Sequence, residues 1–232
     1  MTMTHTDNEH TARNQVLTIV LTSYLMIVLD ISIVITGLPD IQQSLGFSPV
    51  ALSWVQSAYL LSFGGFLLLA ARAGDLFGRK RMLLAGLALF TTASMAVGLA
   101  STPAWLIGAR AIQGIGAAIL APSVLALIST TFPEGAERTR ALSYYSMVAG
   151  AGSAIGLVLG GYFAGQISWR VGFFINVPIG IVLMVSAARV IRESALHTGA
   201  LDLLGALTST VGMISLVFGI VHAVGLMQVW SR

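Results

Sequence analysis

Long apolar runs separated by short polar segments define this chain. After a polar, threonine-rich stretch over 1–14, apolar residues dominate from about Val16 to Leu38. Further apolar runs follow at about 50–71, 82–101, 104–130, 141–166, 172–190 and 203–226. A helix needs ~20 residues to cross a bilayer, and no run shows the period-two alternation of a membrane β-barrel strand. The pattern therefore predicts seven membrane-spanning helices.

The first run is retained in this interpretation, because it exceeds the ~7–15 apolar residues of a signal peptide and no small-residue cleavage site follows it promptly. We expect a cytoplasmic polar tail over 1–14 and a six-helix bundle over 15–190. A cytoplasmic loop over 191–202 and a seventh helix with its outer end over 203–232 complete the expected organisation. The predicted fold class is an all-α polytopic membrane protein.

Composition agrees with a membrane location. Only 9% of the residues are charged and the mean hydropathy is +0.88, whereas about a quarter of an ordinary soluble domain is charged. A soluble enzyme domain is excluded, and we expect no enzyme activity and no cofactor. The absence of cysteine excludes disulfides, thiolate metal sites and cysteine nucleophiles. No phosphate-binding P-loop occurs, so the chain by itself is not an ATP-driven pump.

Basic residues fall unevenly across the predicted connections. One side receives Arg13, Arg72, Arg79, Lys80, Arg81, Arg138, Arg140, Arg189 and Arg192, and the other only Arg170 and Arg232. Because basic residues concentrate on the cytoplasmic side, the N-terminus is predicted to be cytoplasmic. Topology thus explains the net charge of +3, and the expected partner is the lipid bilayer, not nucleic acid. A seven-helix receptor or rhodopsin would instead have its N-terminus outside.

Two charged residues lie inside predicted helices. A central Asp or Arg costs ~2.5–3.5 kcal/mol on insertion scales, so each is a functional candidate. Asp30 in the first helix and Arg110 in the fourth lie about 13 and 10 Å below the outer surface at 1.5 Å per residue. They could face each other across a cavity, where a titratable carboxylate beside a fixed cation suits a proton-coupled carrier. The alternative is a plain ion pair that holds the two helices together.

The connection between the second and third helices has the sequence R-A-G-D-L-F-G-R-K-R over 72–81. Its charges alone suggest a topological anchor with a tight glycine turn. Asp75 can pair with a basic residue or cap a helix, and Gly78 permits a positive φ. Other polar residues within helices are weaker candidates for lining a cavity, and the tyrosines are read foremost as interfacial anchors. They are Gln56, Tyr59, Tyr144, Tyr145 and Asn176.

Four stretches in consecutive elements resemble motifs of the major facilitator superfamily, in its fourteen-helix drug:proton antiporter branch. They are L-D-I-S-I-V-I-T-G-L-P over 29–39, G-D-L-F-G-R-K-R over 74–81, L-I-G-A-R-A-I-Q-G-I-G-A-A over 106–118 and G-S-A-I-G-L-V-L-G-G over 152–161. The sequences S-W-R over 168–170 and F-F-I-N-V-P over 173–178 also look typical of that branch. The chain departs from the motifs at Ala71, Leu76 and Leu157, the last replacing a proline, and at Ser32 and Ile35.

The resemblance implies roles for particular residues. Asp30, Arg110 and Gln113 would serve proton coupling and translocation, with Arg110 tuning the protonation of the carboxylate. Asp75, Gly78 and Arg79 would form a cytoplasmic latch that stabilises the outward-facing state. A helix-packing set would let the fifth helix approach the other half of the transporter. The alternative is packing inside one bundle or in a homodimer seam. This set is Gly114, Gly152, Gly156, Gly160 and Gly161.

The same resemblance implies two inverted three-helix repeats followed by a linker helix. The chain then corresponds to the N-terminal portion of a proton-coupled secondary transporter that exports small amphipathic or drug-like compounds across the plasma membrane. Its expected partners are the proton, a small-molecule substrate and a missing C-terminal half or second chain. The alternative is a truncated, non-transporting membrane protein or a half-carrier that acts only with a partner chain.

Overall fold

The predicted helical bundle is confirmed in a computed structural model that describes residues 3–193, 204–205, 207–209, 211–216 and 219. Its elements are α1 (Met3–Leu45), α2 (Pro49–Phe77), α3 (Arg79–Gly98), α4 (Pro103–Thr131), α5 (Ala136–Gln166), α6 (Trp169–Phe174) and α7 (Asn176–Val190). The pair α6 and α7 makes one apolar span, Trp169–Val190. Among the described residues, six helices are therefore long and apolar enough to cross a membrane.

Only parts of the seventh predicted helix, 203–226, lie within the described residues. They include most of a shorter apolar helix, Leu207–Leu216.

The helices are longer, and their connections shorter, than the apolar runs suggest. Two helices begin with a hydroxyl cap followed by proline: the Ser48 and Thr102 side chains accept the backbone N–H of Ala51 and Trp105. This capping satisfies donors that have no partner in the first turn, and proline lacks a donor there.

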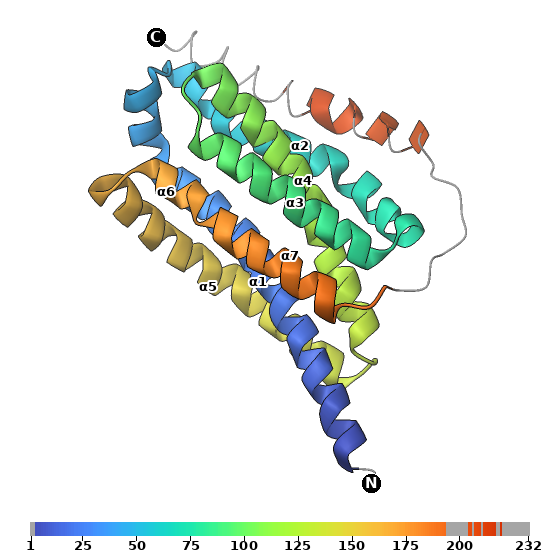
Figure 1. The fold of residues 1–232 in the computed structure, drawn as a ribbon. Helices are drawn as coiled ribbons and strands as arrows, with labels where there is room; N and C mark the ends of the chain where they lie inside the picture. Colours follow the sequence, from blue (N-terminus) through green and yellow to red (C-terminus); the bar gives the residue numbers. More distant parts are fainter. Residues whose placement is uncertain (1–2, 194–203, 206, 210, 217–218, 220–232) are drawn as a thin grey trace.

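α1 extends beyond its predicted span at both ends. It begins at Met3, within the predicted polar tail, and its first turns project beyond the rest of the bundle (Figure 1). At the other end it continues through Pro39 to Leu45, where a connection over 40–49 was expected. The reason is packing, because Ile41 is fully buried in an apolar cluster with Val34, Phe47 and Val55.

The packing of the helices follows two three-helix repeats. α1 packs along α5, and its counterpart α4 packs along α2. α3 contacts both α4 and α7, and α7 also contacts α1. α2 and α5 consequently lie at opposite sides of the bundle (Figure 1). The first helix of each repeat is thus central, which places Asp30 and Arg110 in the interior.

Three of the α5 glycines form a seam against α1. A Cβ atom at Gly156 would lie 2.7 Å from the Ser32 Cβ, and one at Gly160 would lie 2.7 Å from the Ile33 Cα. Gly152 faces Leu25 and Val28 in the same way. The close neighbours of these three glycines belong to their own bundle, which agrees with the alternative of packing inside one bundle. Gly161 differs, since it is exposed and a Cβ there would meet nothing within 4 Å.

The last span is interrupted between α6 and α7. Pro178 has no N–H to donate to the carbonyl four residues earlier, and α7 begins at Asn176 after a break at Ile175. By contrast, α5 carries Leu157 where the motif has proline, and it runs unbroken for 31 residues.

Candidate functional site

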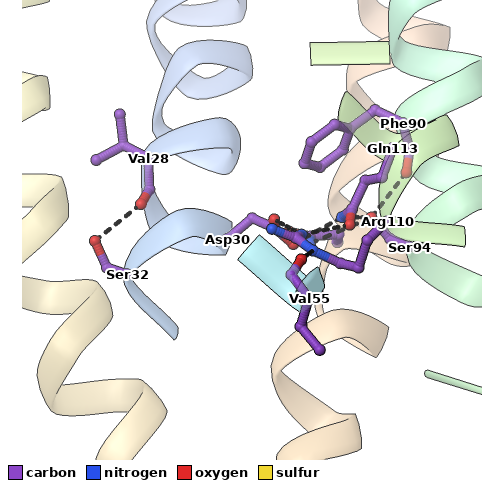
Figure 2. Close-up of polar contacts among 9 residues, drawn as sticks. Val28, Asp30, Ser32, Val55, Phe90, Ser94, Arg110 and Gln113 are labelled. Carbon is purple, nitrogen blue, oxygen red and sulfur yellow. Dashed lines mark hydrogen bonds and ion pairs between the residues drawn. The ribbon is translucent and has the colours of Figure 1, made fainter. Parts of the chain in front are cut away.

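The centre of the bundle holds a buried ion pair. Nη1 of Arg110 on α4 donates to Oδ2 of Asp30 on α1 at 2.6 Å. The side chains are 1% and 0% exposed, respectively. Asp30 projects from α1 towards α4, on the side of the helix away from Ser32 (Figure 2). The two charges predicted at similar depth therefore touch directly and do not face each other across a cavity.

Three polar side chains complete the site around the carboxylate. Nε2 of Gln113 donates to Oδ1 of Asp30 at 2.7 Å and to Oγ of Ser94 at 2.8 Å (Figure 2). Nδ2 of Asn176 donates to the same two atoms at 3.2 and 3.4 Å. Both carboxylate oxygens of Asp30 thus accept hydrogen bonds, from α4 and α7, and the Ser94 hydroxyl on α3 joins the two amides.

The guanidinium of Arg110 has further contacts of its own. Its Nε donates to the Val55 carbonyl of α2 at 3.2 Å, and Nη1 also donates to Oε1 of Gln113 at 2.6 Å. Its central carbon lies 4.2 Å from the ring centroid of Tyr59 and 5.9 Å from that of Phe173. The cation is therefore held by a charge, two neutral acceptors and an aromatic face.

Local sequence explains how these side chains reach the site. The Ser94 hydroxyl donates to the Phe90 carbonyl one turn earlier, which leaves its oxygen free to accept from the amides. The break caused by Pro178 places Asn176 at the first position of α7. A helix N-terminus favours nearby negative charge, so α7 stabilises the Asp30 carboxylate with its amide side chain and with its dipole.

The Asp30 carboxylate is the one member of the buried pair that a proton could neutralise. A buried charge is stable only when it is paired and hydrogen-bonded, and the Asp30 carboxylate meets both conditions. Taking up a proton would remove its charge and replace an acceptor with a donor. The ion pair between α1 and α4 would then lose its electrostatic basis. The charge of Asp30 therefore contributes directly to the contact between the first helices of the two repeats.

The loop between α2 and α3 is reduced to Gly78, which has a φ of +101°. Nη2 of Arg79 lies 3.5 Å from Oδ1 of Asp75, and Nη1 donates to the Ala126 carbonyl of α4 at 3.1 Å. The predicted Asp75–Arg79 pair is therefore present, and Arg79 also ties this turn to α4.

Glu193 is a part of this turn that sequence reasoning missed. Its carboxylate accepts the backbone N–H groups of Lys80 and Arg81 at 3.1 and 3.2 Å. It thereby caps α3, for which Gly78 supplies no side chain. In the sequence, Glu193 is an acidic residue shortly after an apolar run. That position alone does not indicate which groups its carboxylate contacts.

The structure also corrects the reading of the polar residues within helices. Tyr59 is not an interfacial anchor, since it is 1% exposed and stacks on Arg110. Tyr145 stacks on Tyr24 with ring centroids 4.0 Å apart. Asn176 belongs to the site although it ranked as a weak candidate, and Ser94 was missed altogether.

The remaining polar candidates lie elsewhere. The Tyr144 hydroxyl accepts from Nε of Arg140 near the start of α5, and Gln56 is half-buried on α2. Within the described ranges, no group of three acidic or histidine side chains could hold a metal ion.

This all-helical membrane bundle shares its fold with transporters of known structure. The sequence profile of the Major Facilitator Superfamily matches residues 20–222, and the chain belongs to this superfamily. Two solved structures share the fold. A bacterial homologue of the human lysosomal transporter Spinster, inward-facing and unoccupied, has a TM-score of 0.65 at 18% identity, over 83% of this chain and 46% of that one. The peptide transporter POT in complex with sulfate has a TM-score of 0.69 at 16% identity, over 93% and 45%.

Curated relatives are named as exporters or resistance proteins. The cephamycin export protein CmcT of Amycolatopsis lactamdurans is 44% identical over 202 residues, 86% of this chain and 42% of that protein. The puromycin resistance protein pur8 of Streptomyces alboniger is 39% identical over 210 residues, 89% and 41%. The multidrug resistance protein Stp of Mycobacterium tuberculosis is 38% identical over 213 residues, 90% and 40%. The chain thus spans about two fifths of the length of these relatives.

Proposed function

We propose that this chain is the N-terminal half of a proton-coupled exporter of small amphipathic or drug-like compounds. It lies in the cell membrane with its N-terminus in the cytoplasm. The cephamycin export named for one relative supports the direction, and the puromycin and multidrug resistance named for two others support the substrate class. The observation that carries the proton-coupled part is the fully buried Asp30–Arg110 pair.

In this proposal Asp30 is the proton carrier. In the arrangement described, its charge holds Arg110 and the bundle centre is closed. A proton that binds the carboxylate neutralises it and releases α1 from α4, and loss of that proton restores the pair. Gln113 hydrogen-bonds to both members, so it holds the carboxylate and the guanidinium in position relative to each other. α1 is the first helix of one repeat and α4 is the first helix of the other. Each protonation step therefore alters how the two repeats are held together.

Two other regions serve the conformational cycle. Asp75, Gly78 and Arg79 act as the cytoplasmic latch of the outward-facing state, through the ion pair and the contact with α4. The exposed face of α5, with Gly161 beside Val158 and Tyr162, receives a second six-helix half or a second chain. Transport is proposed for the carrier that contains both halves.

Proton-driven transport in everted membrane vesicles tests the proposal. The carrier containing this chain, with the amphipathic dye ethidium as the probe, is compared with its Asp30→Asn variant. We expect the variant to lose dye accumulation driven by an imposed pH gradient. Asp40→Asn is the matched control, because Asp40 lies on the same helix and is only half-buried. Accumulation by Asp30→Asn that equals the control would remove Asp30 from coupling.

A further inference from the structure

Tyr59 of α2 covers the cation of the buried pair. Its ring centroid lies 4.2 Å from the central carbon of the Arg110 guanidinium, and the residue is 1% exposed. An aromatic face attracts a cation at this distance, and the attraction is larger when both groups are removed from water. Tyr59 is therefore an energetic partner of Arg110 as well as a packing neighbour.

This contact remains when Asp30 is neutral. Among the described residues, the guanidinium has one charged partner, Asp30 of α1. If that carboxylate becomes neutral, Arg110 cannot follow, since arginine keeps its proton in proteins. What remains are the Val55 carbonyl, the Gln113 amide oxygen and the aromatic rings of Tyr59 and Phe173. The Phe173 centroid, at 5.9 Å, is near the limit of such contacts, so Tyr59 supplies the main aromatic share.

The hydroxyl group of Tyr59 does not account for its position. Among the described residues, this buried oxygen has no hydrogen-bond partner, and an unsatisfied buried hydroxyl lowers stability. The favourable polar contact of the side chain is thus made by the ring face. A phenylalanine could make the same contact, whereas an aliphatic residue could not.

The backbone at Tyr59 also lies directly against α4, the helix that carries Arg110. Gly114 lies one turn after Arg110 on α4, and a Cβ at Gly114 would collide with the Tyr59 carbonyl oxygen. The glycine therefore brings the backbone of α2 into direct contact with α4. Together with the bond from Arg110 to the Val55 carbonyl, this contact makes α2 and α4 a unit in which the cation keeps its place.

We propose that Tyr59 is the positioning residue that holds Arg110 inside the bundle while Asp30 is neutral. The arginine then stays aligned, and the ion pair re-forms when the proton leaves. This inference rests on the proposed coupling role of Asp30. It adds that α2 supplies uncharged contacts to Arg110, which are the Tyr59 ring and the Val55 carbonyl.

Asparagine at position 30 imitates the neutral carboxylic acid and allows a test without transport. The unfolding equilibrium constant of the purified chain in detergent is measured by SDS titration for Tyr59→Leu, in the parent sequence and in the Asp30→Asn background. We expect the increase caused by Tyr59→Leu to be about tenfold larger in the Asp30→Asn background, because there the ring is the main remaining attraction on the cation. In the parent, the Asp30 carboxylate still holds the guanidinium after the ring is lost. Tyr59→Phe is expected to match or exceed the stability of tyrosine in both backgrounds.

Phe132→Leu is the matched control, because Phe132 is buried at the end of α4 away from the pair. Its effect should be equal in both backgrounds. If Tyr59→Leu prevents folding of the parent, Tyr59→Met takes its place with the same expectation. Equal effects of the aliphatic variant in the two backgrounds would overturn the inference, and so would a Tyr59→Phe variant as unstable as Tyr59→Leu. The proposed function fails separately, if Asp30→Asn leaves proton-driven transport intact.

Discussion

The Asp30–Arg110 pair should dominate the stability of this bundle, and a double-mutant cycle can measure its share. The perturbations are Asp30→Asn, Arg110→Gln and the double variant. Each single change leaves the partner buried without its counter-charge. The double variant leaves two amides, which can bond to each other and to Gln113 without any buried charge.

The structure sets the expected magnitude. Both side chains are at most 1% exposed and the N–O distance is 2.6 Å, so neither charge can be solvated after its partner is removed. Breaking such a buried pair costs about 3–5 kcal/mol. Because the double variant removes both charges, it should lose clearly less than the sum of the singles. Both single variants lose stability because they break the same ion pair, so we expect a coupling energy of about 2–4 kcal/mol between the two positions.

SDS unfolding of the purified chain in detergent micelles gives the four free energies of the cycle. The Arg13–Glu137 pair provides the matched control, since its N–O distance is 3.1 Å but its side chains are 33% and 45% exposed. Exposed pairs couple by less than about 1 kcal/mol. A cycle at Asp30 and Arg110 that closes additively, or with the small coupling of the control, would refute the reasoning from burial.

Two further predictions concern the glycine seam and the α3 cap. Gly160→Ala should destabilise the bundle by about 1–3 kcal/mol in the same unfolding assay, because its Cβ would meet the α1 backbone. A Cβ at Gly161 would meet nothing within 4 Å, so Gly161→Ala should be neutral or stabilising by up to about 1 kcal/mol. Equal losses of stability in the two variants would contradict close packing of α5 on α1 at Gly160. Glu193→Ala should increase amide exchange in the first turn of α3 about fivefold, as loss of a cap worth about 1 kcal/mol implies. Glu134→Ala, whose side chain is 89% exposed, should leave that turn unchanged.

The spanning helices and the need to pair the two buried charges could be predicted from the sequence. Both follow from the free-energy cost of leaving polar or charged groups without partners in the bilayer, whatever the side-chain packing. Apolar runs of bilayer length leave few alternatives to spanning helices. A charge within such a run must find a partner, and counting residues from the outer ends placed Asp30 and Arg110 at similar depth. Depth alone left open whether the two faced each other across a cavity or formed a plain ion pair, and the structure shows the pair.

The remaining members of the site depend on helix rotation, which the sequence does not display. Each residue turns a helix by about 100°, so a small error in orientation decides whether a single hydroxyl or amide faces inwards. Ser94 and Asn176 carry no charge, and nothing in their runs requires a partner. Tyr59 was assigned to the interface for the same reason, since an amphipathic ring is compatible with either place. The partner of Glu193 lies more than a hundred residues away, a distance no local pattern bridges.

The two faces of α1 are joined to the bundle by different means, and this difference limits how the bundle can move. Asp30 faces the polar network, while Ser32, about 200° further around the helix, packs on Gly156 of α5. The network depends on charge and weakens when Asp30 is neutral. The glycine seam depends on close backbone approach, which has no titratable member and leaves no room for a side chain to shift. We infer that neutralising Asp30 separates α1 from α4 but not from α5, so that α1 and α5 move together.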